Sequence, residues 1–245
     1  MTESAPGTHI LWHWPVFGEV HADTVIVTWV AMIAGMVFFG RLGASYRQHR
    51  VTKLQTTLEA TVNWLSDLAI STLGRSGERA VPFFLCLFFF IFLLNQIGMI
   101  PFRELGWSYG GSPTADINTT AALALMVFVL IQIAAIRRHG LKFYAHYFTP
   151  FWWLFLINII EDLARPVTLA LRLFGNIFAG EILLFIIASV IVQQVSVGPV
   201  NVSLGVAIVG PIVVLLFNLF VGTLQAFVFT LLTIVYTSSA FAEEH

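Results

Sequence analysis

One arginine lies in the middle of a strongly apolar stretch of this sequence. Arg172 sits within LALRLFGNIFAG (169–180), and the charged residues Glu161, Arg165 and Glu181 flank that stretch. A charged side chain near the centre of a lipid bilayer costs about 2.5–3.5 kcal/mol on insertion scales. Such a side chain requires a partner and indicates a functional site.

A helix through this segment would place polar and small residues on one stripe with Arg172. Asn176 falls about 40° from Arg172 at 100° per residue, whereas Glu181 falls near the opposite side of the helix. Arg172 would therefore have to meet a carboxylate on another helix or on another chain. Small residues such as Gly175 and Ala179 would allow that neighbour to approach closely.

The chemistry of arginine limits what Arg172 can do. A guanidinium group keeps its proton in proteins, so Arg172 is not a proton carrier. Its fixed charge pushes a neighbouring carboxylate toward the ionised form and blocks a continuous path for cations. An arginine between two polar routes would separate them and would discharge a carboxylate brought past it. One alternative is an internal ion pair with Glu161 or Asp162 that only stabilises the helices.

Polar residues also recur near the C-terminus. Asn218, Gln225 and Tyr236 share one face of a helix to within about 20°. If the last two helices pack as an antiparallel hairpin, these groups can meet the Arg172 stripe. The alternative is that they form only interhelical hydrogen bonds.

The composition places these residues in a membrane. The 245 residues are 58% hydrophobic and 10% charged, whereas soluble domains are about 25% charged. The net charge of −1 leaves no basic surface for nucleic acid. A single cysteine, Cys86, excludes a disulfide framework and a thiol metal cluster. We therefore expect one polytopic helical bundle over residues 1–245 and no soluble domain.

Uncharged segments predict five membrane helices, at about 20 residues per span. The segments 24–40, 80–102 and 117–136 are the first three. The uncharged run 182–242 is long enough for two spans, with 193–205 as the turn. The predicted class is an all-α membrane protein.

Two further segments surround the first span. Residues 1–22 lack the pattern of a signal peptide and are interpreted as an external tail. Apolar residues recur every three or four positions over 51–74, which predicts an amphipathic helix on the membrane surface. The alternative for 51–74 is a helix of a small soluble insert.

The distribution of lysine and arginine predicts the orientation. Basic residues crowd the segment between spans one and two and follow span three, whereas the loop between spans two and three has only Arg103. Cytoplasmic loops carry the excess of basic residues. The N-terminus should therefore lie outside and the C-terminus in the cytoplasm. We find no internal repeat, which disfavours an inverted-repeat transporter.

Four segments resemble a known family. RPVTLALRLFGNIFAGE (165–181) is similar to the signature of subunit a of F-type ATP synthases, the stator subunit against which the rotor ring turns. FFFIFLLNQIGMIP (88–101), PTADINTTAALAL (113–125) and LQAFVFTLLTIVY (224–236) resemble its other segments in the expected order. NIIEDLARP and ADINTT are most similar to the cyanobacterial and chloroplast branch.

The resemblance implies roles around the essential arginine. Arg172 matches the arginine that faces the ion-carrying carboxylate of each passing rotor subunit. Asn176 and Gln225 match polar residues beside it, and Glu181 matches the acidic residue of the half-channel open to the outside. Many relatives have a histidine in place of Asn218, whereas asparagine cannot titrate. Asp116 is the candidate that could compensate.

The resemblance also implies residues along both access routes. Asn95, Asp116 and Asn118 match polar positions of the outer half-channel. Glu161, Arg165 and Tyr236 would lie toward the cytoplasmic half-channel. In the family the last two helices, here within 147–240, form a long tilted hairpin that packs against the ring.

The implied function is ion translocation without catalysis. The expected partners are the c-ring, peripheral-stalk b-type subunits and membrane lipid, and the transported ion is H⁺ or Na⁺. Neither a cofactor nor a metal site is expected, and the chain has no GxxxxGK phosphate-binding loop. The expected location is a bacterial plasma membrane, with a thylakoid as the other possibility.

Two rival classes are weighed against this interpretation. A self-contained ion channel or ion-coupled transporter gated by Arg172 would move ions without any partner. An intramembrane protease would need a GxSG serine together with a histidine in a span, or an HExxH zinc motif. The sequence has no HExxH motif, and although it contains one GxSG run, GRSG (74–77), no histidine lies within a predicted span.

Overall fold

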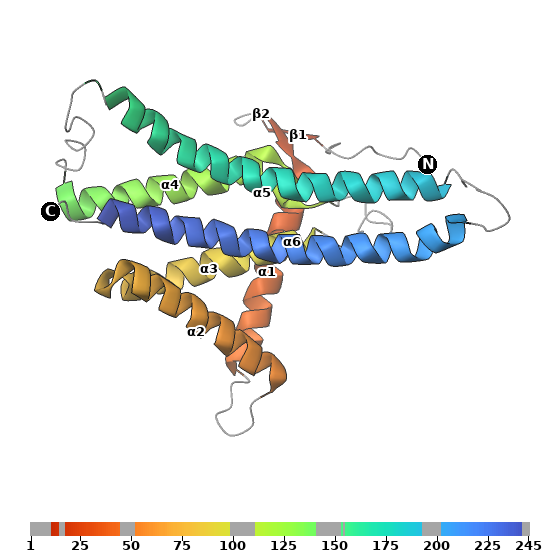
Figure 1. Ribbon diagram of the computed structural model, residues 1–245, viewed down its shortest axis with the longest axis horizontal. Helices are drawn as coiled ribbons and strands as arrows, with labels where there is room; N and C mark the ends of the chain where they lie inside the picture. The colour runs from red at the N-terminus through yellow and green to blue at the C-terminus, as the bar shows by residue number, and fades with distance from the viewer. Residues whose placement is uncertain are drawn as a thin grey trace. The chain divides into compact units, whose positions relative to one another are not determined.

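Helices dominate the structure, which is a computed structural model. It describes residues 11–14, 18–44, 52–98, 111–140, 153, 155–192 and 202–241. In this part of the chain the elements, shown in Figure 1, are β1 (Leu11–Trp14), β2 (Gly18–His21), α1 (Ala22–Ala44), α2 (Lys53–Leu73), α3 (Arg75–Ile97), the 3₁₀ helix η1 (Pro113–Ala115), α4 (Ile117–His139), α5 (Phe155–Val192) and α6 (Val202–Phe241). The predicted all-α membrane class is confirmed, with one short antiparallel hairpin, β1–β2, in addition.

Five helices are long and apolar enough to cross a membrane. The candidate spans are Ala22–Ala44, Gly77–Ile97, Ile117–Arg138, Phe155–Leu183 and Ile212–Ser239. The first three contain or overlap the uncharged segments that the sequence singles out. The division of the run 182–242 into two spans is wrong, because α5 already begins at Phe155 and carries its polar residues inside the fourth span.

The last two helices are longer than a bilayer requires. α5 has 38 residues and α6 has 40, which at 1.5 Å per residue is about 60 Å each. The hydrocarbon core of a bilayer is about 30 Å thick. Each helix therefore extends beyond the core or tilts within it.

The helix α2 has the predicted amphipathic pattern. Leu65 and Ala69 are buried, whereas Asn63 and Asp67 are exposed. The Thr52 side chain accepts a hydrogen bond from the Gln55 N–H and so caps the first turn. At the other end Gly74 adopts a φ of 62°, which an L side chain rarely tolerates.

The chain consists of two compact units. Unit 1 contains residues 1–32, 92–120 and 172–226, and unit 2 contains residues 33–91, 121–171 and 227–245. Helices α1, α3, α4, α5 and α6 each contribute residues to both units. The polar contacts that could move an ion lie within one unit or the other, and each unit is described by itself below.

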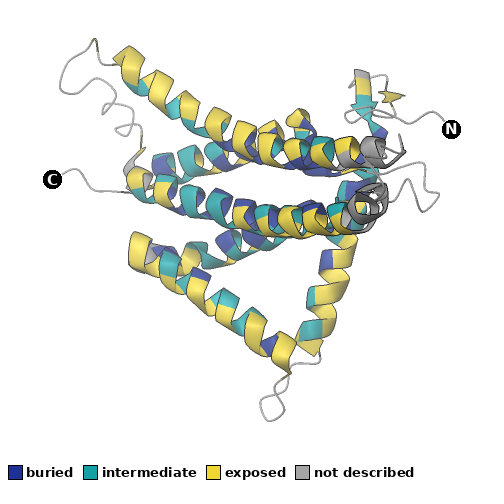
Figure 2. Cartoon of the chain, turned by 45° about the vertical axis from the view of Figure 1, so that its right-hand side comes forward, coloured by how far each residue is buried: buried dark blue, intermediate teal, exposed yellow. Residues whose placement is uncertain are grey.

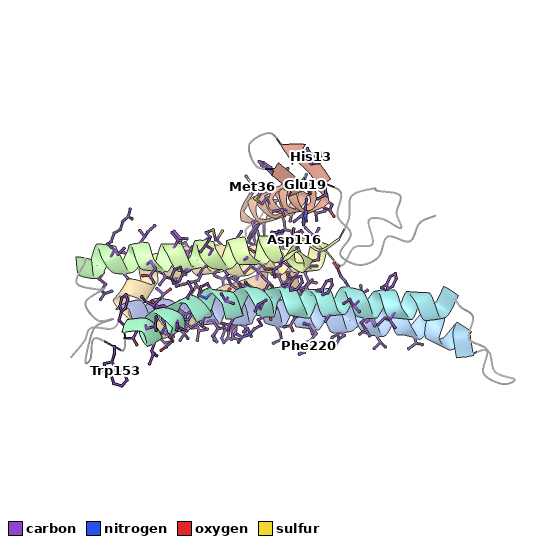
Figure 3. All side chains as sticks on the ribbon, turned by 90° about the horizontal axis from the view of Figure 1, so that it is seen from above. His13, Glu19, Met36, Asp116, Trp153 and Phe220 are labelled. Atoms are coloured by element: carbon purple, nitrogen blue, oxygen red, sulfur yellow. The ribbon has the colours of Figure 1, made fainter. Side chains whose placement is uncertain are left out.

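Large apolar side chains remain exposed along α5 and α6. Figure 2 shows exposed residues over much of both helices, and Leu163 and Phe220 are among the most exposed. Phe220, Trp153 and Met36 are labelled in Figure 3. Contiguous exposed apolar surface of this kind indicates contact with lipid or with protein partners.

Candidate ion-translocation site

Unit 1 contains a cluster of polar groups around a glutamate. We define the Glu181 cluster as Asn95, Ser112, Thr114, Asp116 and Glu181. The Ser112 N–H donates to Glu181 Oε1 at 2.9 Å, and the Ser112 and Thr114 hydroxyls are 2.7 Å apart. The Thr114 hydroxyl donates to Asn95 Oδ1 at 2.8 Å. These contacts join Asn95, Thr114, Ser112 and Glu181 in series, and Asp116 belongs to the cluster only as the last residue of the turn that begins at Ser112.

The cluster is anchored to α6 through Asn95. The Asn95 amide donates to the Gly222 carbonyl at 2.9 Å, and the side chain is 1% exposed. Its neighbour Gln96 approaches the Thr223 hydroxyl at 3.3 Å. A buried amide whose hydrogen bonds are satisfied in this way fixes the relative position of α3 and α6 within the unit. The role of Asn95 in the outer access route stays a prediction.

The short segment Ser112–Asp116 supplies most of the cluster. Ser112 precedes the 3₁₀ helix η1 and Asp116 follows it, with the Asp116 N–H bonded to the Pro113 carbonyl. The whole segment is buried. Proline at the start of η1 fits because its missing N–H is not needed there. The turn therefore holds Ser112 and Asp116 in fixed positions at its two ends.

Gly98 makes room for this segment. A Cβ added at Gly98 would collide with the backbone and side chain of Ser112. We predict that Gly98→Ala lowers the free energy of unfolding by about 1–3 kcal/mol, the usual cost of overpacking. The midpoint of thermal unfolding of the protein in detergent measures this change.

The control for this variant is Gly43→Ala. No atom lies within 4 Å of a Cβ added at Gly43, and alanine is the better helix former. Gly43→Ala should therefore leave the midpoint unchanged or raise it. Equal midpoints for Gly98→Ala and the wild type would contradict the close packing of Gly98 on Ser112.

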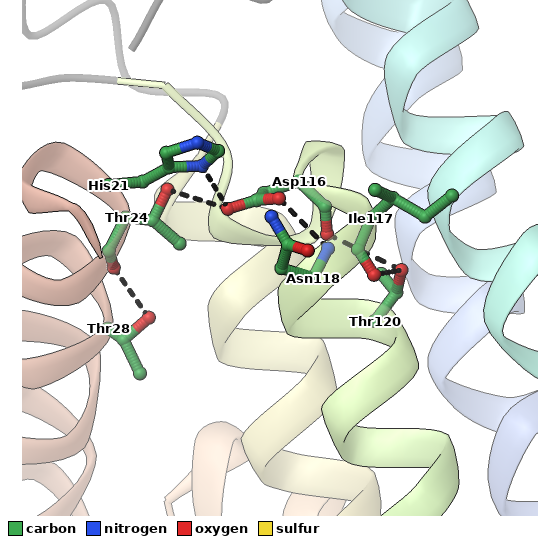
Figure 4. Close-up of polar contacts among 7 residues, drawn as sticks. All are labelled: His21, Thr24, Thr28, Asp116, Ile117, Asn118 and Thr120. Atoms are coloured by element: carbon green, nitrogen blue, oxygen red, sulfur yellow. Dashed lines mark hydrogen bonds and ion pairs between the residues drawn. The ribbon is translucent and has the colours of Figure 1, made fainter. Parts of the chain in front are cut away.

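Asp116 also binds the start of α1 and the start of α4. Its Oδ1 accepts the Asn118 N–H at 2.9 Å, so Asp116 caps the first turn of α4. Its Oδ2 lies 2.7 Å from His21 Nδ1 and 3.3 Å from the Thr24 hydroxyl (Figure 4). The Asn118 side chain is exposed, so Asn118 joins the cluster through its backbone.

The Arg172 stripe lies on α5 within the same unit. Asn176 Nδ2 donates to Gln225 Oε1 at 2.8 Å, so the polar face of α6 meets the stripe as the helical geometry predicts. Gln225 is 3% exposed, and its Nε2 has no partner among the described residues. An unpaired buried donor of this kind costs about 1–3 kcal/mol.

Arg172 itself is exposed and forms no hydrogen bond or ion pair with any described residue. A Cβ added at Gly175, one turn further along α5, would touch nothing within 4 Å. The alternative of an internal pair with Glu161 or Asp162 is not found in the described part of the chain. Both carboxylates bind Arg165 instead.

Asn218 lies close to the helix turn that carries Glu181. A Cβ added at Gly180 would approach Asn218 Cγ to 2.9 Å and Nδ2 to 3.1 Å. Gly180 therefore allows α6 to approach α5 at this point. The structure thus places the Asn218 amide, which cannot titrate, next to Gly180, the residue that precedes Glu181.

Unit 2 contains a second group of polar residues, the Arg165 cluster, which we define as Gln132, Glu161, Asp162, Arg165 and Tyr236. The Arg165 guanidinium contacts Glu161 Oε1 at 3.1 Å and Asp162 Oδ1 at 3.0 Å. It also lies 5.4 Å from the centre of the Tyr236 ring, within the range of a cation–π interaction. The predicted residues Glu161, Arg165 and Tyr236 are therefore brought together.

A cavity of about 210 Å³ adjoins the Arg165 cluster. Its lining includes all five members of the cluster together with Asn158 and Ser239. Gln132 donates to Asp162 Oδ2 at 3.4 Å, and its buried Oε1 has no partner among the described residues. A cavity of this size with several polar groups has room for ordered water.

Several members of these sites lie outside the residues that the sequence predicts. They are Ser112, Thr114, His21 and Gln132. The Ser-Pro-Thr-Ala-Asp run carries the only local signal, since serine before a proline favours a turn. Nothing in the sequence pattern connects that turn to Glu181, which is 69 positions away.

Comparison with known proteins assigns the family. The family model described as "ATP synthase A chain" matches residues 25–238. "ATP synthase subunit a" of Desulforamulus reducens is 35% identical over 95% of this chain and 84% of its own length. "ATP synthase subunit a 1" of Syntrophotalea carbinolica is 39% identical over 78% and 74%. "ATP synthase subunit a" of Moorella thermoacetica is 35% identical over 89% of each chain.

The five apolar helices and these similarities agree with the expectations drawn from the sequence. The protein is an integral protein of a bacterial membrane and associates with the rest of an ATP synthase. The chain therefore belongs to the ATP synthase subunit a family, and it is the non-catalytic, ion-translocating stator subunit of that complex.

Proposed function

We propose that Arg172 faces the ion-carrying carboxylate of each rotor subunit and separates two half-channels. One observation carries this proposal: Arg172 is exposed on α5, without a partner among the described residues, and lies in sequence between the Arg165 and Glu181 clusters. A fixed positive charge on α5 blocks a continuous path for cations. It also favours the ionised form of any carboxylate that approaches.

The two clusters would supply the two access routes. Ions enter at the Glu181 cluster, with Asn95 and Asp116 beside it, and neutralise a rotor carboxylate that can then move through lipid. After almost a full turn the carboxylate comes beside Arg172, ionises and releases its ion toward the Arg165 cluster. Each elementary charge that crosses 100 mV supplies about 2.3 kcal/mol. Several ions per turn then drive ATP formation elsewhere in the complex.

The finer assignments of partner and location belong to the same proposal. The rotor partner is the c-ring, the stationary partners are peripheral-stalk b-type subunits, and the ion is H⁺ or Na⁺. The excess of basic residues after the first and third spans favours a cytoplasmic C-terminus and an external N-terminus in a bacterial plasma membrane. The similarity of NIIEDLARP and ADINTT to the cyanobacterial and chloroplast branch stays a prediction, since the relatives named above are from other bacteria.

Reconstitution distinguishes this proposal from a self-contained channel. Liposomes that contain the chain alone should conduct few ions, because no rotor carboxylate carries them past Arg172. Liposomes that contain the complete membrane sector should conduct ions under an imposed potential. Equal conduction by the chain alone and by the complete sector would support the channel instead.

The Arg165 cluster predicts unequal effects of its two carboxylates. Asp162 is 18% exposed and also accepts from Gln132, whereas Glu161 is 66% exposed. Exposed ion pairs contribute only about 0–1 kcal/mol because water screens them. Asp162→Asn should therefore reduce ATP-driven pumping in vesicles more than Glu161→Gln does. The reverse order, measured at equal amounts of assembled complex, would contradict the assignment.

A further inference from the structure

A histidine outside the predicted site residues contacts the Glu181 cluster. His21 is the last residue of β2 and directly precedes α1. Its Nδ1 lies 2.7 Å from Asp116 Oδ2 (Figure 4). The His21 side chain is 27% exposed, whereas the Asp116 side chain is 5% exposed. The imidazole therefore contacts both solvent and a buried carboxylate.

The hydrogen bonds around Asp116 fix this contact. Asp116 Oδ1 accepts the Asn118 N–H, and Oδ2 accepts the Thr24 hydroxyl and faces His21 Nδ1. Each of these contacts of the carboxylate thus comes from a group that can donate a hydrogen bond. An ionised Asp116 orients His21 with its Nδ1–H toward Oδ2.

The same buried turn connects Asp116 to Glu181. Asp116 ends the segment Ser112–Asp116, and the Ser112 N–H at its other end binds Glu181. Asn218, which lies near Gly180, cannot titrate, whereas an imidazole takes up and releases protons near neutral pH. The titratable partner that Asn218 does not supply is thus available at the start of α1.

We propose that His21 and Asp116 form a proton-receiving dyad at the mouth of the Glu181 cluster, an inference that rests on the proposed ion-translocating function. The imidazole binds a proton from water on its far nitrogen. The Nδ1–H bond then breaks as an O–H bond forms at Asp116 Oδ2, which leaves a neutral imidazole and a neutral carboxyl group. Release of that proton toward Glu181 restores the carboxylate. The ring then loses the proton on its far nitrogen to water and takes up one from water at Nδ1, which restores the first tautomer.

Other titratable groups lie on the elements that carry the dyad. Asp23 is buried in the first turn of α1, and Glu19 lies two residues before His21 on the same face of β2. Glu19 forms an exposed pair with His13 of β1 at 3.4 Å (both are labelled in Figure 3). Glu181 is the acidic group contributed by α5. The described charged groups around His21 are thus mostly acidic.

The test is the rate of ATP synthesis by the reconstituted complex at a fixed driving force, measured against the pH on the side where ions enter. The dyad should contribute most to the rate at high pH, where the proton concentration on the inlet side is low. His21→Gln should therefore lower the rate by about tenfold at alkaline pH and little at acidic pH. This effect is smaller than the roughly 100-fold contribution of many positioned acid–base groups, because water can occupy the space left by the ring.

Two comparisons separate proton transfer from a structural role. Imidazole added on the inlet side should restore the rate of His21→Gly at alkaline pH. His13→Gln is the matched control, because His13 is exposed on the same hairpin and pairs with Glu19, and it should keep the wild-type profile. A wild-type profile for His21→Gln, or a uniform loss at every pH without rescue by imidazole, would overturn the inference.

Arg172→Ala, assayed on the same preparation, keeps the two proposals distinguishable. If it abolishes synthesis while His21→Gln behaves as the wild type, only the dyad is wrong. If Arg172→Ala retains synthesis, the proposed role of Arg172 is wrong, whereas the pH profile of His21→Gln still decides whether the dyad is right.

Discussion

An Arg172→Ala complex should assemble normally and lose ATP-driven ion pumping. The side chain is exposed on α5 and forms no hydrogen bond or ion pair with a described residue, so its removal should disturb little within the subunit. The loss should exceed about 100-fold, as when a preorganised charge is removed from a site where charge develops. Pumping in inverted membrane vesicles, with the amount of assembled complex determined on the same preparation, measures it.

Two further variants test whether the charge alone is enough and whether the effect is specific to Arg172. Arg172→Lys keeps the charge but loses the planar pair of donors that matches a carboxylate, so it should retain partial activity. Arg137→Ala removes an exposed arginine near the end of α4 and should pump normally. Full pumping by Arg172→Ala would reduce Arg172 to a structural role and move the ion chemistry to Glu181 and Asp116.

A Glu181→Gln complex should also assemble but pump about 100-fold more slowly, the lower range for loss of a positioned acid–base group. The glutamine amide oxygen can still accept the hydrogen bond that Glu181 receives from the Ser112 N–H. The geometry of the cluster is therefore preserved, while the group that can bind and release an ion is lost. The pumping rate and the thermal midpoint of the complex should be measured together.

The control for Glu181 is Glu78→Gln, which removes an exposed carboxylate in the first turn of α3. It should change neither the rate nor the midpoint. If Glu181→Gln lowers the midpoint as much as Gly98→Ala does, the loss of pumping reflects packing. Normal pumping by Glu181→Gln would leave Asp116 as the carboxylate of the access route.

Contacts that follow from helical periodicity could be predicted from the sequence. Asn176 and Gln225 occupy defined faces of two long helices, and an antiparallel hairpin is enough to bring such faces together. The hydrogen bond between them confirms that reasoning. The role of Asp116 as a helix cap can also be inferred from the sequence, because capping is a local interaction.

The contacts of the Glu181 cluster could not be predicted from the sequence, because they join residues that are far apart along the chain. The bond from Ser112 to Glu181 joins a backbone N–H to a side chain 69 positions away, and a backbone N–H has no sequence pattern. The bond from Asn95 to the Gly222 carbonyl is of the same kind. These contacts depend on how η1 packs against α3 and α5, which local propensities do not determine.

The fourth span and the β1–β2 hairpin could not be placed correctly from the sequence. The run 182–242 was divided in two because it lacks charge, yet α5 carries Glu161, Arg165 and Arg172 inside a candidate span. A helix tolerates charge in a membrane where the charged side chains pair or face a polar cavity. The hairpin β1–β2 was missed because each strand has only four residues, too few for a clear alternation.

The exposure of Arg172 also bears on the biogenesis of the complex. A free subunit would present this charge to lipid at a cost of about 2.5–3.5 kcal/mol, and the proposed rotor carboxylate would remove that cost only after docking. Partner binding stabilises the bound form by mass action, so subunits without a ring should be the preferred substrates of membrane quality-control proteases. The residue that we propose to separate two ion routes would thus also signal whether the subunit has joined its rotor.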